Sequence, residues 1–321
     1  MKHLFIINPV AKGIKGKTKK LKEMIHSFFK EYPDLHFDIF ESRWCRDSLT
    51  FIRRYITDKD ETFRIHSIGG NGTLYEIVNS IVGLENAQVA AHPYGSANAF
   101  LRYFGSKNQK HFLSLKSQVF DKTVSLDIIR CGTNYGVGFA LSGMEAFVNM
   151  KGDEWIAKGM PEDIAYMAAA VYYFFRGKIT QKYFIEIDDE KIEGDFLSIL
   201  AANAPCYGKN MYPAVDAHPD SGRLDVYLLK NTSRRRQLLN IPVYTSGGYR
   251  KIPDVISYYK AKKIKLYSDK VMCMSIDGQT LYGTSIEYEL IPKAINFVCP
   301  NEVDLAKLPL IYGNPKEGLR T

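Results

Sequence analysis

The feature that most restricts the fold of this 321-residue chain is a regular alternation of apolar strand patterns and amphipathic helix patterns near its start. Short apolar runs at 2–8, 35–41, 63–68 and 89–92 alternate with helical patterns, the clearest of which spans 17–30. Strands separated by helices of this length pair in parallel through right-handed crossovers. The first part of the chain is therefore predicted to be an α/β domain.

Beyond Thr123 the alternation gives way to a series of strand patterns. Residues 124–131 and 135–141 are predicted as a pair of hairpin strands, and helices are predicted at 145–158 and 162–176. Most of the remaining chain has the pattern of strands joined by turns. This predicts an antiparallel β domain, and the change of pattern places the boundary near residue 124.

Composition and charge exclude several other classes of protein. The content of 45% hydrophobic and 24% charged residues is typical of a globular protein. The start of the chain has no secretory signal pattern, and the longest apolar run is well short of the roughly 20 residues that cross a bilayer. The five cysteines include no Cys-x-x-Cys pair, which argues against a zinc site or a disulfide framework. We therefore expect a cytoplasmic protein with reduced thiols.

A glycine-rich turn joins the third predicted strand to the helix that follows it, with the sequence Gly69-Gly70-Asn71-Gly72-Thr73. Glycines let an anion approach the backbone closely, and the start of a helix offers unpaired N–H groups and a partial positive charge. These are the properties of a phosphate-binding loop. The same turn could be a tight connection only, and it matches neither the Walker pattern nor Gly-x-Gly-x-x-Gly.

Two other predicted strands end in similar turns. Asn8-Pro9 closes the first strand and is followed by Gly13 and Gly16, while residues 93–98 close the fourth strand with Pro-Tyr-Gly-Ser-Ala-Asn. In an open parallel sheet, ligands bind at the carboxyl ends of the strands. We therefore expect the three loops to converge on one nucleotide.

These motifs resemble those of the diacylglycerol kinase catalytic-domain family, which includes bacterial lipid kinases and lies in a superfamily with NAD kinases and phosphofructokinases. The likeness runs through nearly the whole chain, in the order that the family has. Its parts are Asn8-Pro9 with Gly13 and Gly16, the segment Gly69–Ser80, the segment Pro93–Arg102, Gly136–Phe139, Pro213-Ala214 with Asp220–Asp225, and Ile276–Gln279.

The resemblance implies an α/β fold in which an N-terminal three-layer nucleotide-binding domain is followed by a C-terminal β-sandwich domain. The first domain would span 1–124 and be joined by the tail 304–321. The second would span 125–303 and complete the active-site cleft.

The resemblance also implies ATP and Mg²⁺ as cofactors and assigns roles to individual residues. The catalytic residues would be Asp277 and Gln279. The magnesium would lie at Asp220, Ser221 and Arg223. The nucleotide would contact Asn8, Gly69, Gly70, Asn71, Gly72, Thr73, Glu76, Ser96 and Asn98.

The chain departs from the family at several carboxylates. The family has aspartate at the positions of Asn71 and Ser221, and glutamate at the position of Gln279. An amide cannot accept a proton and is a weaker ligand for a hard cation, while general-base catalysis is worth about 10²–10⁴ in rate. Asp277 keeps its motif and is the best remaining candidate for the base. The other retained carboxylates are Glu76, Asp127, Asp220 and Asp225.

Three functions remain open at this point. The leading one is ATP-dependent phosphorylation of a lipid hydroxyl, with diacylglycerol as the default acceptor. The second is a pseudokinase that keeps the fold, and with it nucleotide binding, as a regulatory module. The third is a kinase for another small hydroxylated molecule, NAD included. Three of the site residues also have a purely structural interpretation. Asn8 can cap a turn, Glu76 can complement a helix dipole and Asp277 can occupy a hairpin turn.

The expected partners follow from the leading function. They are a nucleotide and a lipid substrate that is met transiently at a membrane surface, peripheral to its inner face. Nucleic acid is not expected, although the net charge of +8 by itself would suit any anionic partner. A homodimer is an alternative that the sequence leaves open.

Overall fold

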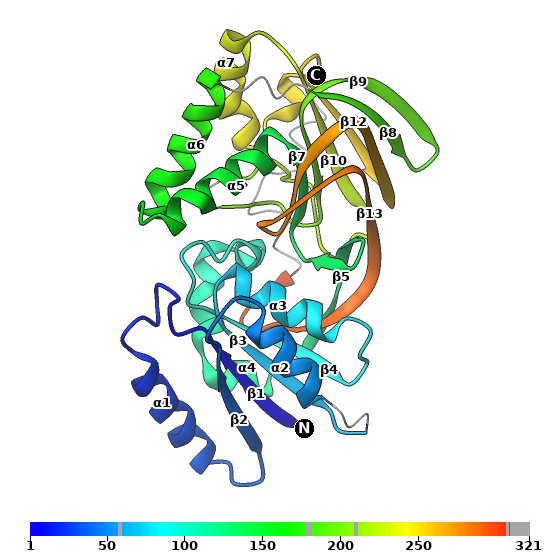
Figure 1. Ribbon diagram of the computed structural model, residues 1–321. Coiled ribbons are helices and arrows are strands. Elements are labelled where there is room, and N and C mark those ends of the chain that lie inside the picture. The colour runs from blue at the N-terminus through cyan, green and yellow to red at the C-terminus, as the bar shows by residue number, and fades with distance from the viewer. Residues whose placement is uncertain (57–59, 177–180, 209–210, 306–307, 309–321) are drawn as a thin grey trace. The chain divides into compact units, whose positions relative to one another are not determined.

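The computed structural model describes residues 1–56, 60–176, 181–208, 211–305 and 308. The chain divides into two compact units, whose elements are labelled in Figure 1. Unit 1 comprises the described residues of 1–128, 206–210 and 292–321, and unit 2 comprises those of 129–205 and 211–291. Of the tail 304–321, which was expected to join the first domain, only 304, 305 and 308 lie within the described residues.

Unit 1 is built on a parallel sheet with the strand order β13–β4–β3–β1–β2. Only the end of β13 belongs to this unit, where Asn296 and Phe297 pair with β4. The strands are β1 (Lys2–Ile7), β2 (His36–Glu41), β3 (Phe63–Gly69), β4 (Ala87–Pro93) and β13 (Gln279–Val298). The helices are α1 (Thr18–Lys30), α2 (Asp47–Tyr55), α3 (Asn71–Ile81), α4 (Leu115–Phe120) and two 3₁₀ helices, η1 (Phe100–Phe104) and η2 (Ser106–Leu113).

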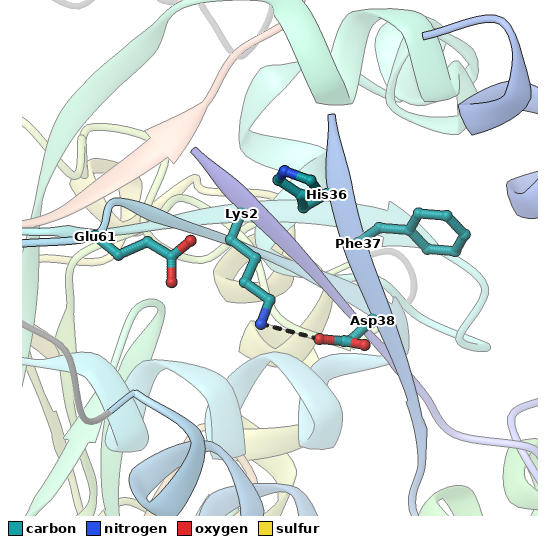
Figure 2. A pocket seen from close by; sticks show the side chains of 5 residues that line it. All are labelled: Lys2, His36, Phe37, Asp38 and Glu61. Carbon is teal, nitrogen blue, oxygen red and sulfur yellow. Dashed lines mark ion pairs between the residues drawn. The ribbon is translucent and has the colours of Figure 1, made fainter. Parts of the chain in front are cut away.

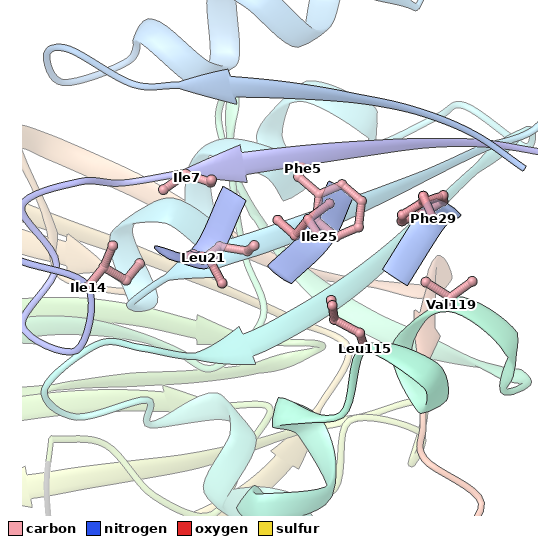
Figure 3. Close-up of a cluster of buried hydrophobic side chains, with 9 residues drawn as sticks. Phe5, Ile7, Ile14, Leu21, Ile25, Phe29, Leu115 and Val119 are labelled. Atoms are coloured by element: carbon pink, nitrogen blue, oxygen red, sulfur yellow. The ribbon is translucent and has the colours of Figure 1, made fainter. Parts of the chain in front are cut away.

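Helices cover both faces of this sheet. Phe5 and Ile7 of β1 pack against α1 and α4 in one buried cluster, drawn in Figure 3. Leu4 and Ile6 alternate with them along β1 and are also fully buried, so the opposite face is covered as well. Each such side chain contributes about 1.5–3 kcal/mol on burial. The alternation of strands and helices therefore produces three layers.

Three buried histidines form a hydrogen-bonded row across the sheet of unit 1. His3 Nδ1 lies 3.0 Å from His66 Nε2, and His66 Nδ1 lies 3.2 Å from His92 Nε2. The His66 ring also stacks on Phe5 at 4.0 Å between centroids. Burial lowers the pKa of His3 to about 4 and that of His92 to about 3, and holds the pKa of His66 well below its usual value. All three imidazoles are therefore neutral at pH 7.

Unit 2 is built from antiparallel strands in the order β11–β10–β9–β7–β12–β13, and β8 pairs with both β9 and β12. The strand β5 (Thr123–Cys131) enters this unit from unit 1. The other strands are β6 (Asn134–Gly136), β7 (Phe139–Gly143), β8 (Gln181–Ile187), β9 (Glu190–Ala202), β10 (Leu224–Lys230), β11 (Ile256–Ala261) and β12 (Lys263–Ile276). The helices are α5 (Met144–Ala157), α6 (Glu162–Arg176), α7 (Arg234–Thr245) and the 3₁₀ helix η3 (Tyr249–Lys251).

The strand predicted at 135–141 is in fact two strands. β6 pairs with β5, whereas β7 pairs with β9 and β12. The chain turns between them because the Asp277 carboxylate accepts hydrogen bonds from the backbone N–H groups of Val137, Gly138 and Phe139, which a continuous ladder would use.

Candidate functional site

The loops that follow β1, β3 and β4 lie together at the carboxyl edge of the unit 1 sheet. Gly13, after β1, donates its backbone N–H to the Tyr94 carbonyl at 2.9 Å, and Tyr94 in turn donates to the Gly69 carbonyl at 3.1 Å. Asn8 donates its backbone N–H to Ile68 at 3.0 Å. The three turns that the sequence singled out therefore form one connected surface within unit 1.

The backbones of Gly70 and Gly95 approach each other closely in this surface. A Cβ atom placed on Gly95 would lie 2.3 Å from Gly70 Cα, and one on Gly69 would lie 2.2 Å from Thr73 Oγ1. No larger residue fits at Gly95 without movement of the backbone. By contrast, a Cβ on Gly72 would meet nothing within 4 Å, so the space beside the first turn of α3 is open.

Two asparagines hold these loops in place through their side chains. Asn71 Oδ1 accepts the backbone N–H of Ala99 at 2.9 Å and so ties the loop after β3 to the loop after β4. Asn98 adopts φ 47° and bonds to its own loop, accepting from Gly95 N at 2.9 Å and donating to the Gly95 carbonyl at 2.9 Å. An aspartate at position 71 could make the same accepting bond, so replacement of the family's carboxylate by an amide preserves this contact.

The remaining predicted nucleotide contacts lie around the start of α3. The first N–H groups of a helix have no partner within that helix, so the turn at 71–73 directs donors towards the loop surface. Thr73 is buried, with Oγ1 at 3.5 Å from Asn8 Nδ2. Glu76 accepts the backbone N–H of Arg46 at 2.7 Å, at the start of α2. Ser96 lies on the loop after β4.

Asp277 occupies the turn between β12 and β13 in unit 2, with φ 44°. Its carboxylate accepts backbone N–H groups from Val137 at 2.6 Å, Gly138 at 3.1 Å and Phe139 at 2.9 Å. Burial raises the pKa of Asp277 to about 6, while the three N–H groups act in the opposite direction. The group can thus exchange a proton near neutral pH, but its oxygens are already engaged in holding the turn at 137–139.

The other residues predicted for catalysis and metal binding are also in unit 2. Gln279 begins β13 and pairs with Ile276 across the same turn. The Ser221 hydroxyl donates to the Arg223 carbonyl at 2.9 Å, the Arg223 guanidinium lies 3.9 Å from Asp188, and Asp220 is exposed. In the part of the chain that the structure describes, no three His, Cys, Asp or Glu side chains gather closely enough to hold a metal ion.

Asp225, which ends the segment that the resemblance links to magnesium, is buried beside tyrosines, basic side chains and a second carboxylate, that of Asp216. Its Oδ1 accepts the hydroxyl of Tyr258 and lies 3.9 Å from Lys260 Nζ, whereas Oδ2 has no hydrogen-bond partner among the described residues. Burial raises the pKa of Asp225 to about 6. The nearby Asp216 carboxylate accepts the Tyr249 hydroxyl at 2.6 Å and lies 2.9 Å from the Arg250 guanidinium. Two carboxylates that are already engaged by tyrosines and basic groups do not supply the oxygen-rich ligand set that Mg²⁺ requires.

A hollow of about 350 Å³ lies at the opposite, amino edge of the unit 1 sheet. Lys2, His36, Phe37, Asp38 and Glu61 line it, as Figure 2 shows. Lys2 Nζ lies 3.2 Å from Asp38 Oδ2. Because this hollow is at the start of β1 and β2, it is separate from the three loops, which follow the ends of their strands.

These observations define a two-domain protein: an α/β unit with glycine loops at the carboxyl edge of a parallel sheet, and an antiparallel β-rich unit. The sequence model of the diacylglycerol kinase catalytic domain matches residues 2–131. The model described as the YegS C-terminal NAD kinase beta sandwich-like domain matches residues 138–299. The chain belongs to the diacylglycerol kinase catalytic-domain family and has the YegS type of C-terminal domain. The predicted family and fold class are thereby confirmed.

Individual relatives agree with this assignment. Proteins named "Putative lipid kinase" from Staphylococcus aureus strains Mu3 and Newman are each 25% identical to this chain over 265 residues, which is 81% of this chain and 83% of theirs. The crystal structure of a "putative diacylglycerol kinase" from Bacillus anthracis superposes with a TM-score of 0.72 at 20% identity, covering 94% of this chain and 96% of that one. That likeness concerns the fold.

None of the helices within the described residues is both long and apolar enough to cross a membrane. The longest apolar helix, α6, has 15 residues.

Sequence reasoning missed two positions that the loop surface depends on. Gly95 was read only as part of a motif, although its contact with Gly70 sets the spacing of two loops. Gly13 donates to Tyr94, and a Cβ at Gly13 would lie 2.9 Å from the Tyr94 carbonyl oxygen. Their glycine identity was visible in the sequence, but the residues that they approach are about 25 or more positions away, and only the folded chain brings them together.

Proposed function

We propose that this protein is an ATP-dependent lipid kinase that transfers the γ-phosphate of ATP to a lipid hydroxyl, with diacylglycerol as the default acceptor. The observation that carries this proposal is the connected surface of three strand-end loops at the start of α3, in a member of a kinase family. Membership of this family implies the use of ATP.

In this proposal the phosphates of ATP lie against the first turn of α3. Gly70, Asn71, Gly72 and Thr73 supply backbone N–H groups and the positive end of the helix dipole. The open space beside Gly72 supports close approach of an anion to the backbone at that residue. Three further residues position the loops or contact the nucleotide, namely Asn8, Ser96 and Asn98. Glu76 stabilises the start of α2 by accepting the backbone N–H of Arg46.

We assign Asp277 as the group that takes the proton of the acceptor hydroxyl. A carboxyl with a pKa of about 6 is suited to this role, because an efficient base has a pKa near the operating pH. Gln279, on the other side of the turn, would orient the acceptor by hydrogen bonding, since an amide cannot accept the proton itself.

In the proposed reaction, Mg²⁺ binds to the protein together with ATP, as a complex with its phosphates. The side chains of Asp220, Ser221, Arg223 and Asp225 do not fit a site for a separate structural magnesium. Mg²⁺ needs few protein ligands when phosphate oxygens and water complete its shell. No step of the proposed mechanism is therefore assigned to these residues.

The alternative function is a pseudokinase that binds nucleotide without transfer. It is favoured by the engagement of the Asp277 carboxylate with three backbone N–H groups and by the amides at Asn71 and Gln279. Both functions require the loops of unit 1, so ATP binding alone does not separate them.

The test measures ATP affinity by calorimetry and phosphate transfer to diacylglycerol in mixed micelles, for the unchanged protein and for Asn71→Asp combined with Gln279→Glu. We expect micromolar ATP binding and slow transfer by the unchanged protein, and transfer faster by about 10²-fold or more in the double variant. Each single variant shows which carboxylate is responsible. ATP binding with no transfer by any of these proteins would identify the pseudokinase.

A further inference from the structure

The outward face of α6 in unit 2 carries a row of large apolar side chains. Ile164, Met167, Val171 and Phe175 recur at intervals of three or four residues and therefore lie on one face of the helix. All four are exposed, Met167 by 64% and Phe175 by 69%. In Figure 1, α6 is the outer helix of the α5–α6 pair. We name these four residues the α6 stripe.

The face of α6 that packs inward carries alanines and aromatic side chains. Ala165 and Ala169 are fully buried, and Tyr173 packs near Phe147 of α5 with 5.9 Å between ring centroids. A surface helix normally turns its apolar side inward and its charged side to water. Here the segment 164–175 contains no charged residue at all, so both sides of the helix are apolar. An exposed apolar surface of this kind marks an interaction site.

The start of α7 places arginines beside this surface. The Arg234 guanidinium lies 5.9 Å from the centre of the Phe174 ring of α6. Arg236 is paired with Asp254, whereas Arg235 is exposed and forms no ion pair with any residue that the structure describes. Further along, α7 exposes Leu238 and Leu239, the latter by 76%. Apolar side chains thus adjoin a cluster of positive charge on the same unit.

We propose that the α6 stripe and the start of α7 form a docking surface for an anionic phospholipid bilayer. Apolar side chains of an interfacial helix insert into the boundary between headgroups and acyl chains, while arginines contact lipid phosphates. The charge complementarity favours this partner over a second copy of the chain, since stacking two such surfaces would bring the arginine clusters together. This inference goes beyond the proposed reaction and requires no turnover.

Sedimentation with vesicles tests this surface on the full chain without nucleotide. The vesicles contain phosphatidylcholine either alone or with about a third of phosphatidylglycerol. We expect the protein to bind the anionic vesicles and Met167→Gln with Phe175→Gln to reduce the partition coefficient at least tenfold, since two apolar insertions are lost. Arg235→Gln should reduce binding to the anionic vesicles about fivefold and leave binding to the neutral ones unchanged.

The matched control is Val271→Gln, because Val271 is also apolar and exposed by 64% in unit 2 but lies on β12. It should bind vesicles as the unchanged protein does. Absence of binding by the unchanged protein, or equal loss in the control, would overturn the proposal. So would an apolar double variant that dissociates a dimer in sedimentation equilibrium while vesicle binding persists, because a second copy would then be the occupant. Thermal unfolding of each variant excludes misfolding as the cause.

Discussion

The loops of unit 1 and the Asp277 turn of unit 2 organise backbone N–H groups in opposite ways. In unit 1, glycine backbones pack directly on each other at Gly70 and Gly95, and the first turn of α3 directs its donors outward. In unit 2, the side chain of Asp277 accepts three N–H groups of the turn at 137–139. The first arrangement depends on the absence of side chains, and the second on one carboxylate.

This difference explains why the departures from the family have unequal consequences. Asn71 keeps the hydrogen bond to Ala99 that an aspartate could make, so the unit 1 loops tolerate the change. Proton transfer tolerates no such exchange, because an amide is not a base. Nucleotide binding and catalysis can therefore diverge within one chain of this family, and the following predictions examine each unit by itself.

The largest effect is expected for Gly95→Ala in unit 1. The added Cβ would lie 2.3 Å from Gly70 Cα, which is a backbone atom that cannot rotate away. We expect a loss of about 3 kcal/mol in the free energy of unfolding and of at least tenfold in ATP affinity. Denaturant titration and calorimetry measure the two quantities. The control is Gly72→Ala, whose Cβ meets nothing within 4 Å and which should be at least as stable as the unchanged protein. Normal stability of Gly95→Ala would contradict the described loop contact.

A smaller effect is expected for Asp277→Ala in unit 2. The change leaves three backbone N–H groups without their acceptor and should lower the free energy of unfolding by about 2–3 kcal/mol. Asp277→Asn keeps one accepting oxygen and should cost about half as much, yet it should abolish transfer if Asp277 is the base. Asp188→Ala is the matched comparison, because Asp188 also has positive φ and accepts the N–H groups of Lys262 and Lys263, but is exposed. Unaltered transfer by Asp277→Asn would assign Asp277 to the turn alone.

The smallest effects are expected from pH, and they have opposite signs in the two units. The row of His3, His66 and His92 has folded pKa values below the usual 6.5, so the unfolded chain binds protons first as pH falls. The contribution of this row to the free energy of unfolding is complete above about pH 6.5 and is lost as pH falls towards 4. The loss is at most about 1.4 kcal/mol for each histidine and each pH unit. The pKa values of Asp277 and Asp225 are raised to about 6 each, so these two carboxyl groups have the opposite effect. Their contribution to the free energy of unfolding is present at low pH and is lost as pH rises through 6.

Denaturant titrations between pH 4 and 8 measure this dependence. His66→Gln should flatten the acid side of the profile relative to the unchanged protein. An identical slope for the variant and the unchanged protein would mean that the buried row does not govern the acid sensitivity of unit 1.

The sequence by itself determined the class of fold and the position of the loops. The alternation near the start of the chain predicted a parallel α/β domain because the period of apolar residues is a local property of each strand and helix. The glycines at 69, 70 and 72 marked the loop for the same reason, since the conformation of a glycine-rich turn is decided by its own residues. The series of strand patterns beyond Thr123 predicted the β-rich second domain in the same way, and the family motifs then added its candidate site residues.

Only the tertiary structure decided which residues meet across long separations. Three contacts join distant parts of the chain. They are the close packing of Gly70 against Gly95, the hydrogen bond between Asn71 and Ala99, and the hydrogen bonds of Asp277 to a turn about 140 positions earlier. The same holds for strand 135–141, which is divided because its N–H groups bond to Asp277 rather than to a neighbouring strand. A sequence pattern carries local preferences, whereas these contacts depend on how whole elements pack, and packing is settled by the complete fold.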